Sequence, residues 1–457
     1  MASPYKIEIG SENTGLWNIK QSTEAARKAT ELLQKDIQNH HVFLNMDGFH
    51  DHMPHHILTL YGTGASVNDL QRAYDLRDPL QRPVMPTHES AVSDLFQSWE
   101  HASKYLGKEE HYPDFLAFFQ RNMESDGYEN VVNEYLLKAD PAADELLLRL
   151  HAGVLHPLIQ LMFGLEWKQP AIVAEALAQA CVHGLEKLDQ LLLESECRAN
   201  KMPLATRMPA ILSVYESMQP NDKIKSAVRT EDIDKIADGL LLRARPELLA
   251  ILGGIKVHPD ELAERTAEMF HALVLVASGA AIHPPHHVKY NFFLMHHINS
   301  ALIYLTINKQ SCISEANKVR MLEWKIRMDV IQYAARGMPE FRLEDIRAYV
   351  PKQRSEGSVR DIGIRLHDFG DDGHAIKQAR ATSVCHELLK AYQDRDWLVL
   401  KNDEIWGQIQ HMVVDAVEGP GKLYVRSAGL QEAWKEIPKQ LEPRRSSEEL
   451  RSLQTGQ

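Results

Sequence analysis

Residues 140–167 read DPAADELLLRLHAGVLHPLIQLMFGLEW, and their pattern indicates the class of fold. Asp140 suits a helix cap and Pro141 suits the first helical position. Behind them, apolar residues recur at spacings of three and four, with charged residues between. We therefore predict a helix through this stretch, bent where Pro157 removes a backbone hydrogen bond.

The same helical period continues along nearly the whole chain. Further helices are expected over residues 22–38, 54–64, 171–194, 290–306, 315–335 and 374–393. Short strands are expected only at 5–9, 397–401 and 423–426. Because strands and helices do not alternate, a parallel sheet or a TIM barrel is excluded. The prediction is a mainly α fold: one large helical catalytic domain over residues 1–441 with few short strands, then a polar, poorly ordered tail over 442–457.

Composition narrows the classes of partner. The 457 residues include 51 Lys and Arg against 63 Asp and Glu, a net charge of −12, so we expect no nucleic acid and no membrane as partner. With no signal-like segment at the N-terminus, the expected location is the cytoplasm. Four cysteines without a CxxC pair exclude a disulfide scaffold, whereas 23 histidines favour metal chemistry.

The histidines occur in clusters on separate helical segments. Metal sites in helical bundles form in this way, because each facing helix projects one or two ligands inward. We therefore predict a metal site between helices. The clusters comprise His50, His52, His55 and His56; His151 and His156; His283, His286, His287, His296 and His297; and His367 and His374.

Helical faces indicate which histidines point inward. His56 shares a face with Leu60, and His156 lies among leucines and isoleucines. His296 and His297 fall on adjacent rows, so either could face the core. The choices of His56 over His52 or His55, and of His156 over His151, also stay open.

Lys377 is predicted on the same side of its helix as His374 and several apolar residues. Burial would lower the pKa of this lysine and favour a neutral amine, which can take up CO2 and become a carbamate, an oxygen ligand for a metal. The alternative is that the side chain extends to the surface. Asp371 and Asp372 precede this helix, either as its cap or as hydrogen-bond partners of the metal ligands.

Four of these segments resemble the questin oxidase-like family of fungal polyketide-tailoring enzymes, and in particular its anthraquinone-cleaving iron dioxygenase. They are HDHMPHHILTLYGTGAS (50–66), HAGVLHPLIQLMFGLE (151–166), KYNFFLMHHINSA (289–301) and RLHDFGDDGHAIKQARA (365–381). The resemblance implies a non-heme Fe(II) dioxygenase of secondary metabolism that uses O2 to cleave a C–C bond in an anthraquinone ring.

The resemblance also implies a ligand set. His56, His156, His296 and His374 would bind the iron, together with a CO2-derived carbamate on Lys377. If each ligand is monodentate, an octahedral ion keeps one position open for O2 or a substrate oxygen. The flat substrate needs a large apolar pocket. Its expected lining is Tyr61, Phe163, Phe292 and Phe293.

Parts of the sequence also suit three other functions. A Baeyer–Villiger-type monooxygenase could act on the same substrates with NADPH, although the chain has no GxGxxG fingerprint. The His50-Asp-His52 spacing suits a zinc metallohydrolase, but that class needs a barrel of alternating strands and helices. The third alternative is a non-catalytic helical binding protein.

Overall fold

Helices supply nearly all the regular structure of the protein. The computed structural model describes residues 1–45, 48–203 and 205–440, and no β-sheet forms within these ranges. The predicted mainly α fold is therefore confirmed, and the barrel that a metallohydrolase requires is missing from the described chain. The tail predicted over residues 442–457 lies outside the described residues.

The first helices form where capping signals lie in the sequence. Ser22 accepts a hydrogen bond from the backbone of Ala25 at the start of α1, and Ser66 forms a capping box with Asp69 at the start of α3. Gly64, with φ 92°, ends α2. This part contains α1 (Thr23–Asn39), α2 (Met53–Thr63), α3 (Val67–Arg77), α4 (Glu89–Gln97), α5 (Tyr112–Asp126) and α6 (Tyr128–Leu136).

The stretch from 140 to 167 does not form the single helix that its pattern predicts. It forms α7 (Pro141–Leu150) and α8 (His156–Glu166), whose axes differ by 67°. The break lies before Pro157, which falls in the first turn of α8. Gly153, Val154 and Leu155 all have positive φ between the two helices. This left-handed run turns the chain, so Pro157 helps to begin a helix instead of bending one.

The remaining helices lie largely where they are predicted, but two of the predicted helices are each divided into two. The segment 171–194 is divided between α9 (Pro170–Val182) and α10 (Asp189–Ala199), and 290–306 between α15 (Phe292–Ala301) and α16 (Ile303–Ile307). The others are α11 (Ile211–Met218), α12 (Asp222–Lys225), α13 (Arg245–Leu252), α14 (Leu262–Ala280), α17 (Glu315–Ala335), α18 (Leu343–Arg347), α19 (Val359–Gly363), α20 (His374–Leu389) and α21 (Asp403–Glu418).

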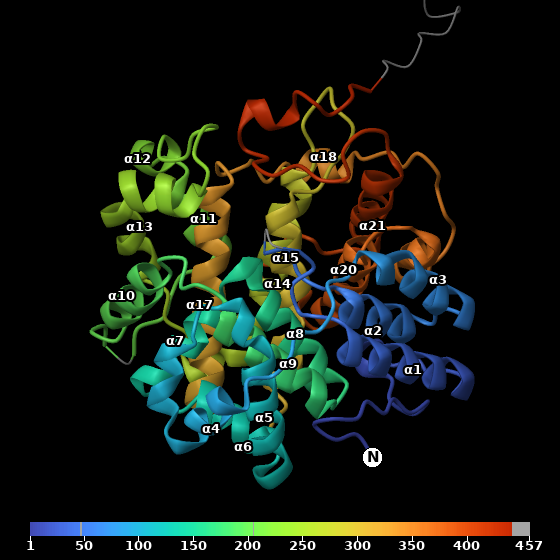
Figure 1. Ribbon diagram of the computed structural model, residues 1–457. Helices are drawn as coiled ribbons and strands as arrows, with labels where there is room; N and C mark the ends of the chain where they lie inside the picture. The colour runs from blue at the N-terminus through green and yellow to red at the C-terminus, as the bar shows by residue number, and fades with distance from the viewer. Residues whose placement is uncertain (46–47, 204, 441–457) are drawn as a thin grey trace, which may run out of the picture.

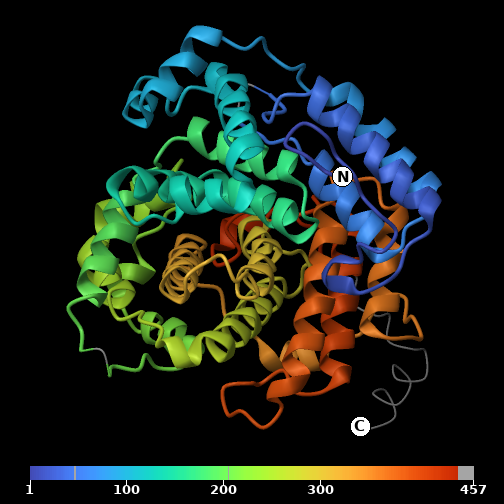
Figure 2. The same cartoon turned by 90° about the horizontal axis from the view of Figure 1, so that it is seen from below.

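Helices of the second half of the chain lie in the interior (Figure 1). Every residue is buried over 266–280 of α14 and over 321–335 of α17, as expected for helices surrounded by other helices. Figure 2 shows them in yellow and light orange, enclosed by green and teal helices of the middle of the chain. The buried apolar side chains form one continuous core, which extends from Ile7 to Ile437.

None of the three predicted strands forms. Lys6 makes an isolated bridge with Ser3, and Val425 makes one with Asn291. The bridge between Val425 and Asn291 does not extend into a strand, because α15 begins one residue after Asn291. The bridge nevertheless holds residues 423–426 against the start of α15. Within the described ranges, no single helix has both the length and the apolar character needed to cross a membrane.

Candidate metal centre and its cavity

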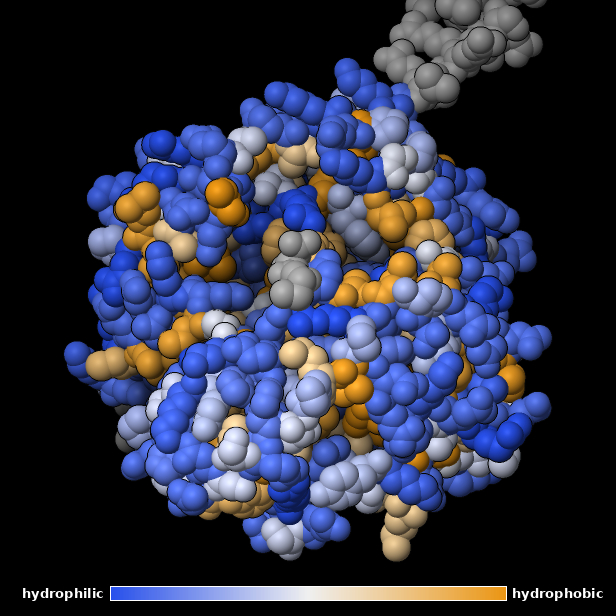
Figure 3. Space-filling model, in the orientation of Figure 1, coloured by the Kyte–Doolittle hydropathy of each residue, from blue (hydrophilic) through white to orange (hydrophobic). Residues whose placement is uncertain are grey.

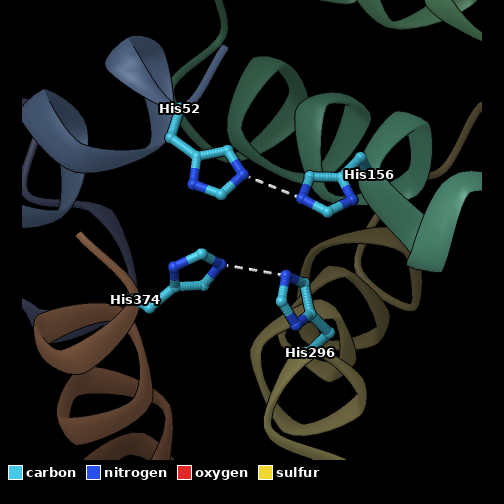
Figure 4. Close-up of side chains that lie close together, drawn as sticks. All are labelled: His52, His156, His296 and His374. Atoms are coloured by element: carbon cyan, nitrogen blue, oxygen red, sulfur yellow. Dashed lines mark hydrogen bonds between the residues drawn. The ribbon is translucent and has the colours of Figure 1, made fainter. Parts of the chain in front are cut away.

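Four histidines from distant parts of the chain meet in the interior (Figure 4). His52 immediately precedes α2, His156 begins α8, His296 lies in α15 and His374 begins α20. All four are buried, and one ring nitrogen of each lies within 4.8 Å of the others. Helices therefore position a compact group of imidazoles.

The distances within this group suit a shared ion. Nε2 of His52 lies 2.8 Å from Nε2 of His156, and Nε2 of His296 lies 3.0 Å from Nε2 of His374. Two imidazole nitrogens that each lie about 2.1 Å from one ion, at right angles, are about 3.0 Å apart. The observed separations match that spacing.

The other ring nitrogens define the tautomers. Nδ1 of His156 donates to the carbonyl of Gly153 at 2.6 Å, and Nδ1 of His296 donates to that of Phe292 at 2.6 Å. Nδ1 of His374 donates to Asp372. With the proton on Nδ1, the Nε2 atom of each of these three rings carries a lone pair that points into the group. This arrangement is typical of metal-binding histidines held by outer partners.

Burial favours the neutral form of His52, His156 and His296. It lowers the pKa of His156 and His296 well below the ordinary value, and neighbouring histidines lower it further. Burial, together with the charge of Lys377, lowers the pKa of His52 to about 3. Neutral rings whose lone pairs face one another repel unless a cation lies between them, so the group has the electrostatics of a cation site.

Asp371 and Asp372 have different roles. Asp371 accepts hydrogen bonds from the backbone of Gly373 and Ala375, and it therefore caps α20. Asp372 accepts from Nδ1 of His374, and its second oxygen lies 3.2 Å from Nδ1 of His52. Burial acts to raise the pKa of Asp372, but the two histidines hold it well below the usual range. Asp372 thus orients two of the four rings.

The left-handed run before α8 positions His156. Val154 has φ 55° and ψ 41°, a conformation that β-branched residues rarely adopt. A Cβ on Gly153 would lie 2.4 Å from the ring of His183. Only glycine fits there, and its carbonyl accepts a hydrogen bond from Nδ1–H of His156.

His56 is not in the group, contrary to the prediction. Its ring packs against Gly373, where a Cβ would lie 2.6 Å from its Cγ. Its place is taken by His52, which precedes α2 and therefore escapes the helical-face argument. In the two other pairs of alternatives, His156 and His296 lie in the group, whereas His151 and His297 do not. His151 donates to the carbonyl of Leu147, and His297 pairs with Asp329 at 2.6 Å, both away from the group.

Lys377 lies one turn after His374 and is only 4% exposed. Burial lowers the pKa of this amine to about 8, although Asp372 and Asp371 act in the opposite direction. Its side chain forms no ion pair with an acidic residue among the described residues. The proximity of Lys377 is evident from its effect on the pKa of His52 and His296. The side chain is therefore buried, which is the alternative that the carbamate prediction requires.

A cavity of about 670 Å³ opens beside the four histidines and contains His52, His156 and His374 in its wall. Phe292 and Phe293 line it, as predicted. Figure 3 shows a hollow near the centre of this face of the molecule, with hydrophobic and strongly hydrophilic side chains around it.

Tyr61 and Phe163 do not line the cavity, and their predicted role is wrong. The hydroxyl of Tyr61 donates to the carbonyl of Gly10, and its ring packs against Trp167. Phe163 stacks on His55 at 5.3 Å in the core. Proximity in the sequence to predicted ligands was a poor guide, since both side chains leave their helices in other directions.

Several residues of the site are not among the predicted ligands or pocket residues. His50 and His183 form a second histidine contact, with 2.7 Å between their Nε2 atoms, and the ring of His50 stacks on His156 at 3.8 Å. Tyr424 lies 5.9 Å from His374, and Arg426 also lines the cavity. These two residues reach the site through the bridge between Val425 and Asn291.

Sequence comparisons place this fold and site among oxidoreductases. The sequence model of the questin oxidase-like family matches residues 49–382, which include all four histidines and Lys377. The chain belongs to the questin oxidase-like family, as its motifs suggested, and is an oxidoreductase.

The relatives share most of the chain. Oxidoreductase AflY of Aspergillus parasiticus is 35% identical over 91% of this chain and 84% of its own length. Questin oxidase of Aspergillus fumigatus is 31% identical over 91% of this chain and 94% of its own length. Baeyer-Villiger oxidase ptaJ of Pestalotiopsis fici is 31% identical, over 95% and 98%.

Proposed function

We propose that the protein is a non-heme iron(II) dioxygenase that opens a ring of an anthraquinone-type polyketide. The observation that carries the proposal is the convergence of ring nitrogens from four buried histidines, with Nε2 atoms 2.8 Å apart in one pair and 3.0 Å apart in the other. The names of the relatives, questin oxidase and Baeyer-Villiger oxidases, support an oxidative attack on this class of substrate.

The proposed ligands are His52, His156, His296, His374 and a carbamate on Lys377. In forming the carbamate, the neutral amine of Lys377 attacks CO2, an N–C bond forms and the amine loses one proton. Burial favours the neutral amine, because it lowers the pKa of the lysine to about 8. The resulting anion would offset part of the metal charge among neutral imidazoles.

Iron(II) in this donor set would supply the electrons with which O2 is activated, and imidazole and carboxylate-like donors suit it. The protein residues position the reactants. Asp372 orients His52 and His374, while the carbonyl of Gly153 orients His156. The buried walls of the site limit the access of water to the bond that is cleaved.

The cavity fits a flat aromatic substrate. Its volume of about 670 Å³ lies within the usual range for ligand pockets. The ring of Phe292 lies 4.5 Å from His296 and 5.3 Å from His374, so an aromatic ligand that stacks on Phe292 would lie beside the proposed iron. Tyr424 forms another part of the wall.

A Baeyer–Villiger-type monooxygenase that consumes NADPH is the second candidate, because several relatives carry that name. In that reaction one oxygen atom of O2 is inserted beside a carbonyl, and the other is reduced to water with the two electrons of NADPH. The two candidates differ in the oxygen atoms of the product.

Turnover under ¹⁸O2 with Fe(II)-loaded protein and a hydroxylated anthraquinone distinguishes them. We expect two labelled oxygens in the ring-opened product, with no consumption of NADPH. One labelled oxygen with one NADPH consumed would favour the monooxygenase, and a product without any label from ¹⁸O2 would indicate a hydrolase. His367→Ala is a matched control, because His367 contacts Thr63 outside the four-histidine group.

A further inference from the structure

A second cavity adjoins the one beside the four histidines. It has a volume of about 600 Å³ and shares Phe293, Tyr424 and Arg426 with the first. These side chains belong to both walls, so the cavity beside the histidines, here called the inner cavity, meets the second, outer cavity at them.

The outer cavity is rich in cationic side chains, although the whole chain carries a net charge of −12. Its wall contains five cationic side chains and two acidic ones, and Lys422 and Glu436 of this set pair with each other. The five are Lys235, Arg336, Lys422, Arg426 and Lys435. Such a local excess attracts anions.

Arg336 is the most unusual of these cations. It is 4% exposed, yet it makes no ion pair with an acidic side chain in the described parts of the chain. One terminal nitrogen donates to the carbonyl of Arg426 at 3.2 Å, and Nε is buried without any hydrogen-bond partner. A buried guanidinium that lacks an anion is costly, and a ligand anion would remove that cost.

Two arginines flank the aromatic wall of the site. The guanidinium of Arg336 lies 4.0 Å from the ring centre of Phe293, and that of Arg426 lies 5.7 Å from the ring centre of Phe292. Phe292 in turn contacts His296. A path of side chains therefore leads from the four histidines to the arginines.

We infer that Arg336 and Arg426 bind an oxyanion of the aromatic ligand, a carboxylate or an ionised phenol. A guanidinium fork matches the two oxygens of a carboxylate, and held at this end the flat ring would lie across Phe292 towards the histidines. The inference rests on the proposed function for the aromatic nature of the ligand. Arg336 and Arg426 are positioning residues in this account.

Binding of two probe compounds to the full-length, metal-loaded protein tests the inference. Anthraquinone-2-carboxylate carries the anion, and 2-methylanthraquinone lacks it. We expect the carboxylate to bind at least about tenfold more tightly. Arg426→Met and Arg336→Met should each remove most of this preference, while the affinity for 2-methylanthraquinone and the metal content stay unchanged.

Two further variants serve as controls. Arg207→Met should keep the preference, because Arg207 lies outside both cavity walls and pairs with Glu261. Arg336→Lys should keep the charge but lose the fork, with an intermediate preference. If Arg336→Met does not fold, Arg426→Met decides the matter, since Arg426 lies at an exposed position.

Equal affinity for the two probes in the unmodified protein would overturn the inference and leave the proposed function intact. Failure of both probes to bind would contradict the anthraquinone substrate itself. Tight binding of NADPH that Arg336→Met abolishes would assign the arginines to a nucleotide phosphate and would likewise overturn the inference.

Discussion

Nε2 of His52 lies 2.8 Å from Nε2 of His156, and both rings are buried. Two neutral imidazoles hold this contact either when Nε2–H of His52 donates to Nε2 of His156 or when a metal ion lies between the two nitrogens. Burial disfavours the protonated ring, since it lowers the pKa of His52 to about 3. A bound metal ion would replace this hydrogen bond between neutral rings with one bond from each nitrogen to the ion.

His52→Ala and His56→Ala distinguish the two histidines. His52→Ala should lose iron and at least about a hundredfold in kcat/KM, because it removes a proposed ligand. His56→Ala should keep its iron, because its ring packs against Gly373 outside the group. Metal analysis of both variants and steady-state kinetics check this, and loss of iron from His56→Ala alone would return the role to His56.

Lys377→Ala should lose activity, and Lys377→Arg should not restore it, because a guanidinium cannot form the carbamate. Bicarbonate or acetate should recover part of the activity of Lys377→Ala by supplying a carboxylate to the emptied space. In protein loaded with zinc and equilibrated with ¹³CO2, carbon-13 NMR should show a carbamate signal that Lys377→Ala lacks. Full iron content and normal turnover in Lys377→Ala would refute the carbamate.

Gly153→Ala should destabilise the protein by about 2 kcal/mol or more, since alanine is strained at positive φ and its Cβ would collide with His183. The shift of this backbone should also weaken metal binding, because the carbonyl of Gly153 holds His156. Gly184→Ala is a matched control with open space around its Cβ. Equilibrium unfolding and metal titration provide the comparison, and equal stability of the two variants would contradict the role of the left-handed run.

The buried carboxyl of Glu175 should make the free energy of unfolding depend on pH. Burial raises the pKa of this carboxyl from 4.5 to about 8, with Asp51 adding to the effect. The folded chain thus retains a proton that the unfolded chain has released, and the free energy of unfolding falls as the pH rises from about 4.5 to about 8. Below about pH 4.5 the carboxyl of Glu175 is protonated in both states, so it has little effect on the free energy of unfolding.

Glu175→Gln removes that titration and keeps an acceptor for the amide of Gln160. At pH 8.5 the variant should exceed the unmodified protein in free energy of unfolding by something on the order of a few kcal/mol, and at pH 4.5 the two should be alike. Urea unfolding at both pH values measures the difference. The exposed Glu24→Gln serves as control, and an equal gain at both pH values would count against the titration.

Much of the fold follows from sequence periodicity. The predicted helix over 315–335 is α17 with the same bounds, because Ser314 caps its start and the apolar pattern is continuous. The break between α7 and α8 has no such signal. Val154 and Leu155 are left-handed only because the surrounding structure holds them there, and local preference favours a continuous helix.

Three members of the four-histidine group, His156, His296 and His374, are among the predicted ligands. His52 is not among the predicted ligands because it precedes α2. Helical spacing does not indicate where a side chain outside the helix points. Arg336 and Arg426 were not predicted at all. Their role depends on a long-range contact, the bridge of Val425 to Asn291, which no local pattern reveals.

The metal content of the protein, purified from iron-supplied cells without chelator, tests the four-histidine centre most directly. We predict about one iron per chain, lost in each of the variants His52→Ala, His156→Ala, His296→Ala and His374→Ala but retained in His367→Ala. Activity should follow the iron in all five variants. Full turnover by protein that contains no iron, or iron retained after loss of any two of the four histidines, would contradict the account.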